Sequence, residues 1–217
     1  FVDTMQYPII TDASTAIASL RTAKIDWYQR VDTQYEATLT KTSPDLIQKK
    51  YLTSFQQRIE LKTDNPIFSD VNVRRALMIG TDLKRIGQNL WGDYWLHAFP
   101  IGPAVDAAYT PLEELPDSAR ELYDYNPEKA KQMLADAGYP EGFKMELVYR
   151  ANRTTSADCA SMIESMWSEL GVDVTLVGLD EAAFGAETMT EVDGKYKYKD
   201  AHVGGNQIPD PLRALSM

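Results

Sequence analysis

The clearest helical pattern in the chain lies between Asn126 and Gly138. Asn126 is suited to cap a helix, Pro127 suits the first helical position, and Gly138 suits the residue after the last turn. The apolar residues between these signals recur at helical spacing and fall on one face: Ala130, Met133, Leu134 and Ala137. The pattern predicts a helix that packs one side against a core.

The same spacing predicts five further helices. Three of them follow an aspartate that can cap the first turn, at Asp12, Asp70 and Asp82. A short helix is expected around Leu39, and a longer one is expected to end at Gly171.

Alternation of apolar and polar residues predicts strands. One strand covers residues 143–149, and another begins at Val172, on the other side of the helix that ends at Gly171. A strand, a helix and a strand within about thirty residues form a βαβ unit, in which the two strands are parallel. With a further strand expected in the stretch Tyr51 to Leu61, the fold class is α/β, a mixed sheet flanked by helices.

Three segments lack a regular pattern. Residues 100–116 hold four prolines and a glycine, which predicts a long proline-rich connection over the surface. The charged run from Glu191 to Asp200 predicts an exposed hairpin or loop. The stretch from Gly204 to Pro211 is rich in glycine, proline and amides, and it predicts a polar loop.

Composition narrows the classes of function. A chain of 217 residues with 44% hydrophobic residues can bury a core, and its length suits one domain or at most two. A net charge of -10 disfavours nucleic acid and anionic membranes as partners. No stretch approaches the ~20 apolar residues of a membrane span. The chain starts at Phe1 and stops shortly after Asp210-Pro211, so we expect a piece of a longer protein.

Residues for catalysis or metal binding are sparse. Cys159 is the single cysteine and lies in a helical pattern, so a packed thiol is expected and no disulfide can form within the chain. His97 and His202 show no metal-site spacing, and each is expected to be solvated. The common catalytic and nucleotide-binding motifs are missing. We therefore expect that the protein binds no cofactor and no metal and that it is not an enzyme. A hydrolase is the remote alternative.

Three runs of sequence, in the same order, resemble motifs of one family. Residues 65–77, NPIFSDVNVRRAL with Asp82 beyond, resemble "PF-x-D-x-x-VRRAL…D", and residues 125–139, YNPEKAKQMLADAGY, resemble "DPEKAKxLLxEAGY". Residues 170–174, LGVDV, resemble "LGIxV", and Asp210-Pro211 matches a late "DP". The family is the family 5 extracellular solute-binding proteins, which includes dipeptide, oligopeptide and nickel binders of ABC importers.

This resemblance implies a periplasmic-binding-protein-like fold of two lobes that close on a ligand and deliver it to a membrane permease. Residues 1–217 are expected to form a single C-terminal lobe. The implied function is capture of a small solute such as a peptide, a sugar or a related polar compound, by a monomeric protein that works with ABC permease subunits. The implied location is periplasmic or extracellular, with a membrane anchor in the full-length protein. A ligand-sensing receptor module with the same lobe is the alternative.

The first candidate ligand residues are Arg150, Asn152 and Arg153, directly after the strand at 143–149. Ligands of open α/β sheets bind at the carboxyl ends of strands, and a guanidinium suits the geometry of a carboxylate. The resemblance implies an arginine in this loop that meets a ligand carboxylate; Arg150 is the better positional match and Arg153 the alternative. Both arginines are equally compatible with solvated loop charges.

Two further groups of candidates follow. The resemblance implies an aspartate near position 207 that holds a peptide ammonium group, but Gln207 stands there, and with Asn206 it suits an uncharged polar ligand or a flexible loop. Trp91, Tyr94 and Trp95 form an aromatic group that is able to stack on a ligand. The alternative is that these rings anchor the proline-rich connection to the core.

Overall fold

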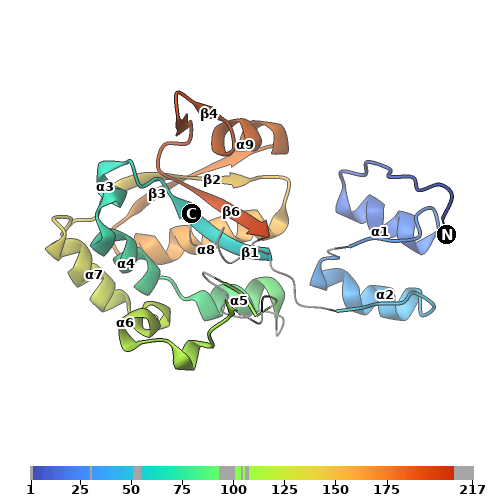
Figure 1. The fold of residues 1–217 in the computed structure, drawn as a ribbon, viewed down its shortest axis with the longest axis horizontal. Helices are drawn as coiled ribbons and strands as arrows, with labels where there is room; N and C mark the ends of the chain where they lie inside the picture. The colour runs from blue at the N-terminus through green and yellow to red at the C-terminus, as the bar shows by residue number, and fades with distance from the viewer. Residues whose placement is uncertain are drawn as a thin grey trace. The chain divides into compact units, whose positions relative to one another are not determined.

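A computed structural model of the chain describes residues 2–29, 31–50, 55–92, 101–103, 105 and 108–207, with the backbone alone for 55, 56, 206 and 207 (Figure 1). The chain divides into two compact units, Phe1–Tyr51 and Leu52–Met217. None of the helices among these described residues is long and apolar enough to cross a membrane.

The first unit contains the helices α1 (Ala13–Arg21) and α2 (Glu36–Thr42), with a 3-10 turn, η1 (Thr33–Tyr35), before α2. Asp12 caps α1 by accepting a hydrogen bond from the backbone N–H of Thr15 at 2.7 Å. Both predicted helices of this region are confirmed.

The second unit is built on a four-stranded sheet with the strand order β1-β6-β2-β3. The strands are β1 (Phe55–Leu61), β2 (Lys144–Arg150), β3 (Asp173–Leu179) and β6 (Ala201–Gln207). β2 is parallel to both β3 and β6, whereas β1 is antiparallel to β6. The sheet is therefore mixed, and the parallel pair predicted from the βαβ pattern is confirmed.

The remaining elements of the unit are α3 (Pro66–Ser69), α4 (Val71–Ile79), α5 (Leu83–Trp91), η3 (Leu112–Glu114), α6 (Asp117–Arg120), η4 (Glu121–Tyr123), α7 (Pro127–Asp136), α8 (Thr154–Ser168), α9 (Glu181–Thr188), β4 (Glu191–Val192) and β5 (Lys195–Tyr196). Helices cover both faces of the sheet, with α8 on one side and α9 on the other (Figure 1). The predicted helix caps Asp70, Asp82 and Asn126 each accept a backbone hydrogen bond at the start of α4, α5 and α7.

One face of the sheet carries the main apolar core. Because strand side chains alternate, the odd-numbered residues of β2 and β6, such as Leu147 and Val203, point to this face. Helices α4, α5, α7 and α8 pack their apolar residues against it, among them Leu77, Leu134 and Ile163. Cys159 is buried in the same core, as predicted, and burial raises the pKa of its thiol to about 12.

The expectation of a loop from Gly204 onward is wrong for residues 204–207. These residues continue β6, where their backbones pair with β1 from Arg58 back to Phe55. An added Cβ at Gly204 would lie 2.3 Å from Oε1 of Glu60, so the end of the Glu60 side chain would have to move. Residues 208–211 lie outside the described part of the chain.

The charged run from Glu191 to Asp200 was predicted more accurately. Residues 191–192 and 195–196 form an exposed two-stranded hairpin, β4 and β5. In the proline-rich connection at 100–116, the described residues include the 3-10 turn η3.

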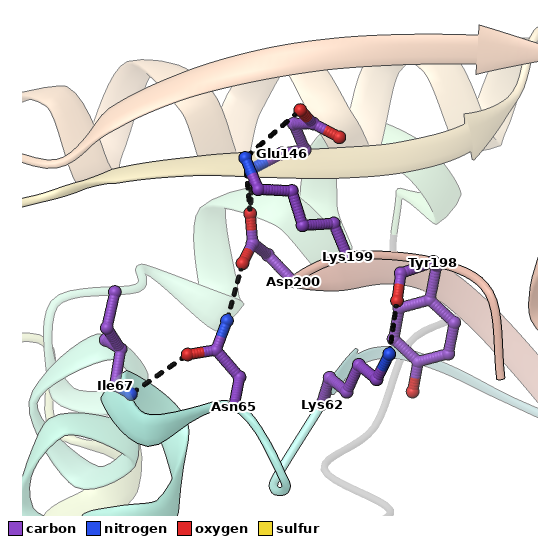
Figure 2. Close-up of polar contacts among 7 residues, drawn as sticks. All are labelled: Lys62, Asn65, Ile67, Glu146, Tyr198, Lys199 and Asp200. Carbon is purple, nitrogen blue, oxygen red and sulfur yellow. Dashed lines mark hydrogen bonds and ion pairs between the residues drawn. The ribbon is translucent and has the colours of Figure 1, made fainter. Parts of the chain in front are cut away.

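A buried aspartate joins the strands at the end of the sheet opposite the carboxyl end of β2 (Figure 2). Asp200 is 3% exposed; its Oδ1 accepts a hydrogen bond from Nδ2 of Asn65 at 2.7 Å, and its Oδ2 accepts one from the backbone N–H of Glu146 at 2.8 Å. Nearby, Nζ of Lys62 donates to the carbonyl of Tyr198 at 3.0 Å. Asp200 thus holds β2 against the chain that enters β6 and against the turn after β1.

Candidate functional site

The face of the sheet that α9 covers carries charged residues near the carboxyl end of β2. We call these residues, with the phenylalanine at their centre, the Phe184 cluster: Arg58, Glu60, Arg150, Arg153, Glu181, Phe184 and His202. Three strands and two helix starts contribute to it. Even-numbered positions of β2 and β6 point to this face, which places Arg150 and His202 on the same side of the sheet.

Arg150 is the last residue of β2 and is held on several sides. Its guanidinium carbon lies 3.8 Å from the centre of the Phe184 ring, and its Nε donates to Oε1 of Glu181 at 3.0 Å. Its backbone N–H donates to Oγ of Ser156 at 3.2 Å. With 10% of its side chain exposed, Arg150 is a fixed charge and not a freely moving loop charge.

Arg153 lies three residues further along, at the N-cap position of α8. Its Nη2 is 3.1 Å from Oε2 of Glu181, so one carboxylate contacts both arginines. About half of the Arg153 side chain is exposed. The two arginines predicted as ligand residues are therefore brought together by Glu181, which the sequence reasoning did not identify.

His202 is buried in β6, and the expectation of a solvated histidine is wrong. Its ring meets those of Phe184 and Tyr198 edge-on, with centroids 5.6 and 4.7 Å apart. Nε2 is 3.7 Å from Oε2 of Glu60, whereas Nδ1 is buried and has no hydrogen-bond partner among the described residues. Burial lowers the pKa of His202, against an opposing effect of Glu60.

Glu60 and Arg58 complete the cluster on β1. Nε of Arg58 donates to Oε1 of Glu60 at 3.0 Å, and Arg58 pairs across the sheet with Gly204, as Glu60 does with His202. The carboxylate of Glu60 therefore lies over the bare backbone of Gly204. The sequence signals for this arrangement were the polar residues of β1 and the histidine and glycine of β6.

The other predicted site residues fall in different places. Asn152 lies exposed in the turn after β2. The backbones of Asn206 and Gln207 lie in β6, at the same end of the sheet as Arg150 because β2 and β6 are parallel; their side chains lie outside the description. Trp91 packs against the main apolar core. Tyr94 and Trp95 lie outside the described residues.

Chemically, the cluster suits recognition of a charged or polar group. It offers two guanidinium groups, one of them against an aromatic ring, at the carboxyl end of a strand, where open α/β sheets bind ligands. In the part of the chain that the structure covers, no group of three or more histidine, cysteine, aspartate or glutamate residues is placed to hold a metal ion.

The fold is similar to those of solved periplasmic binding proteins. The periplasmic binding protein DppA from Helicobacter pylori, in complex with the peptide STSA, superposes with a TM-score of 0.75 at 22% identity, over 95% of this chain and 38% of that one. HbpA2 from Haemophilus parasuis gives a TM-score of 0.59 at 27% identity, over 93% of this chain and 38% of that one. The chain thus has the α/β fold of a periplasmic binding protein.

Sequence comparison identifies the family. Residues 2–216 match the family described as "Bacterial extracellular solute-binding proteins, family 5 Middle", and the chain belongs to it. The predicted resemblance to family 5 is thereby confirmed.

Curated relatives are named for the molecules that they bind. Heme-binding protein A of Haemophilus influenzae is 30% identical over 190 residues, which are 84% of this chain and 33% of that protein. Oligopeptide-binding protein AppA of Bacillus subtilis is 27% identical over 80% of this chain and 33% of its own length. The chain spans about a third of the length of the curated relatives it matches, and it groups with binding proteins and not with enzymes.

Proposed function

We propose that this chain supplies one side of a solute-binding cleft and that Arg150 and Arg153 meet a carboxylate of the solute. The observation that carries the proposal is the pair of arginines at the carboxyl end of β2, of which Arg150 is fixed against Phe184 and by Glu181. A pre-oriented guanidinium loses little side-chain entropy on binding, which favours affinity and selectivity.

The names of the relatives agree with this chemistry. One curated relative is a heme-binding protein, another an oligopeptide-binding protein, and a third, from Salmonella typhimurium, a glutathione-binding protein. Heme, oligopeptides and glutathione all carry at least one carboxylate. A small carboxylate-bearing solute, such as a peptide or a related polar compound, is therefore the ligand class we propose.

The proposal extends to the whole protein. In it, residues 1–217 belong to the C-terminal lobe of a two-lobed protein, and the sheet-bearing unit Leu52–Met217 faces the cleft. The full-length protein is a monomer that works outside the cytoplasm, held at the membrane by an anchor, and passes its solute to ABC permease subunits. Cell fractionation and co-purification with the permease are the measurements for location and partner.

Ligand capture is tested by thermal unfolding of the full-length protein against peptides, glutathione, heme, oligosaccharides and nickel complexes. A ligand at 100 times its Kd stabilises the folded state by about 2.7 kcal/mol, so one carboxylate-bearing class should raise the Tm by several degrees. Absence of a shift with every class would contradict capture as the function. Stabilisation by an uncharged oligosaccharide alone would contradict the role of the arginines.

The arginine is tested by Arg150→Ala on the ligand found in that screen. Loss of a charged hydrogen bond should weaken binding by about 1.5 to 3 kcal/mol, which isothermal titration calorimetry measures directly. Arg75→Ala is the matched control, because Arg75 is also paired with a glutamate, Glu121, but in the helical layer away from the sheet. Equal affinities of wild type and Arg150→Ala would remove Arg150 from the site.

A further inference from the structure

The carboxylate of Glu181 occupies the place between the two arginines. Glu181 is the first residue of α9, and its two oxygens point to different partners, Oε1 to Nε of Arg150 at 3.0 Å and Oε2 to Nη2 of Arg153 at 3.1 Å. About half of the Glu181 side chain is exposed. An anionic ligand group that approaches these arginines therefore meets a resident carboxylate.

Glu181 contacts one edge of the Arg150 guanidinium group and does not contact the other edge. Glu181 takes Nε, and within the described residues neither terminal nitrogen of Arg150 has a hydrogen bond to another group. The two terminal nitrogens form the end-on edge that pairs with a carboxylate in a bidentate way. Glu181 thus contacts Arg150 at Nε, and among the described residues no hydrogen bond occupies the end-on edge.

Glu181 also sets the charge of this part of the cluster. Arg150, Arg153 and Glu181 together carry one net positive charge, and loss of the carboxylate would leave two. Coulomb energy increases with the charge of the ligand, so the resident carboxylate opposes a dianion more strongly than a monoanion. Its effect should therefore appear as selection between ligands of different charge.

We propose that Glu181 is a specificity-determining residue that lowers the preference of the arginine pair for dianionic groups over a single carboxylate. It does so by neutralising one of the two positive charges and by orienting Arg150 for end-on pairing. The inference rests on the proposed function, in that it assumes that the arginine pair faces the ligand.

The test uses three probes of one shape in the full-length protein: succinate, monomethyl succinate and dimethyl succinate. Their binding is followed through the NMR signals of the arginine Nε–H groups in wild type and in Glu181→Gln. The substitution should strengthen binding of monomethyl succinate roughly three-fold, the scale of a partly exposed charge pair, and binding of succinate by a larger factor, up to roughly ten-fold. Dimethyl succinate should show no change.

Glu121→Gln is the matched control, because Glu121 also joins two cations, Arg75 and Lys129, with distances of 2.5 and 2.7 Å. It changes the net charge equally but should leave all three probes unaffected. Glu181→Asp keeps the charge and should retain the wild-type ratio of affinities for succinate and monomethyl succinate. It tests the inference even if Glu181→Gln loses stability. Thermal unfolding checks that each variant is folded.

Equal strengthening of both anions by Glu181→Gln, no change in either, or no binding of any probe would each overturn the inference. These results are distinguishable from failure of the proposed function. A solute found in the ligand screen, with no effect of Glu181→Gln on the probes, contradicts the role of Glu181 alone. A changed preference among the probes, with no solute captured, contradicts solute capture alone.

Discussion

The two faces of the four-stranded sheet differ in kind, although the same strands build both. On one face, residues such as Leu147 and Val203 are sealed under α4, α5, α7 and α8 in an apolar core. On the other, α9 covers a smaller apolar group, and the same strands carry Arg150, His202 and Glu60. A buried charge destabilises a fold unless it is paired. Charged residues on only one face of the sheet therefore indicate that this face has a role beyond stabilising the fold.

The two faces of the sheet therefore differ in what stabilises them. The apolar face gives most of the packing area, and its residues are replaceable only by others of similar volume. The charged face depends on pairings, Arg150 with Glu181 and Arg58 with Glu60. Substitutions on the first face should therefore change the free energy of unfolding, and substitutions in the Phe184 cluster should change binding or pH dependence.

The largest effect is expected on the apolar face. Leu147 is fully buried, and Leu147→Ala should lower the free energy of unfolding by about 3 kcal/mol, through lost burial and the cavity left behind. Denaturant unfolding measures the change in free energy. The folded fraction of the variant should bind the ligand with unchanged affinity. A loss of less than about 1 kcal/mol would mean that this face packs loosely.

A somewhat smaller effect is expected at Asp200, the buried aspartate that ties β2 to its neighbours (Figure 2). Asp200→Ala leaves Nδ2 of Asn65 and the N–H of Glu146 without their acceptor, which should cost about 2 kcal/mol of unfolding free energy. Asp173→Ala is the control, because Asp173 makes an exposed ion pair with Lys144 and should change stability by under ~1 kcal/mol. Equal effects of the two substitutions would show that burial of Asp200 is unimportant.

The smallest effect is a change in pH dependence from His202. Its pKa is lowered in the folded protein from 6.5, mainly by burial, so the unfolded state binds the proton more readily. The stability gained by keeping His202 neutral is full above pH 6.5, decreases as the pH falls below this value, and is lost once the folded-state pKa is reached. His202→Gln should flatten the curve of unfolding free energy against pH between about 7 and 5.

The charged neighbours of His202 allow a second test of this prediction. Glu60 raises the pKa of His202, and Arg150 and Arg58 lower it. Glu60→Gln should therefore lower that pKa further and extend the loss of stability to more acidic pH. An unchanged pH profile in His202→Gln would assign the acid sensitivity to other groups.

Local signals predicted the elements that have strong caps and regular spacing. The helix after Asn126 begins at Pro127 as expected, and the unit β2–α8–β3 follows from short-range alternation and the stop at Gly171. The family resemblance rests on these same elements. They are encoded within a few residues, which is why a single sequence reveals them.

Long-range pairing was not predictable in the same way. Gly204 and Gly205 are typical of a loop, yet they lie in a strand because β1, far away in the chain, supplies the backbone partners. His202 is buried because α9 and Tyr198 cover it, and the pairing of Glu181 with Arg150 depends on the same docking. The arginines of the candidate site were found from their place after a strand, whereas the carboxylate between them was not.

The account's central claim is that the arginines beside Phe184 meet a solute carboxylate. A crystal structure of the full-length protein with its co-purified or screened ligand tests this most directly. We expect a ligand carboxylate oxygen within about 3.2 Å of a guanidinium nitrogen of Arg150 or Arg153. A ligand bound in the protein with neither arginine within hydrogen-bonding distance would contradict the claim.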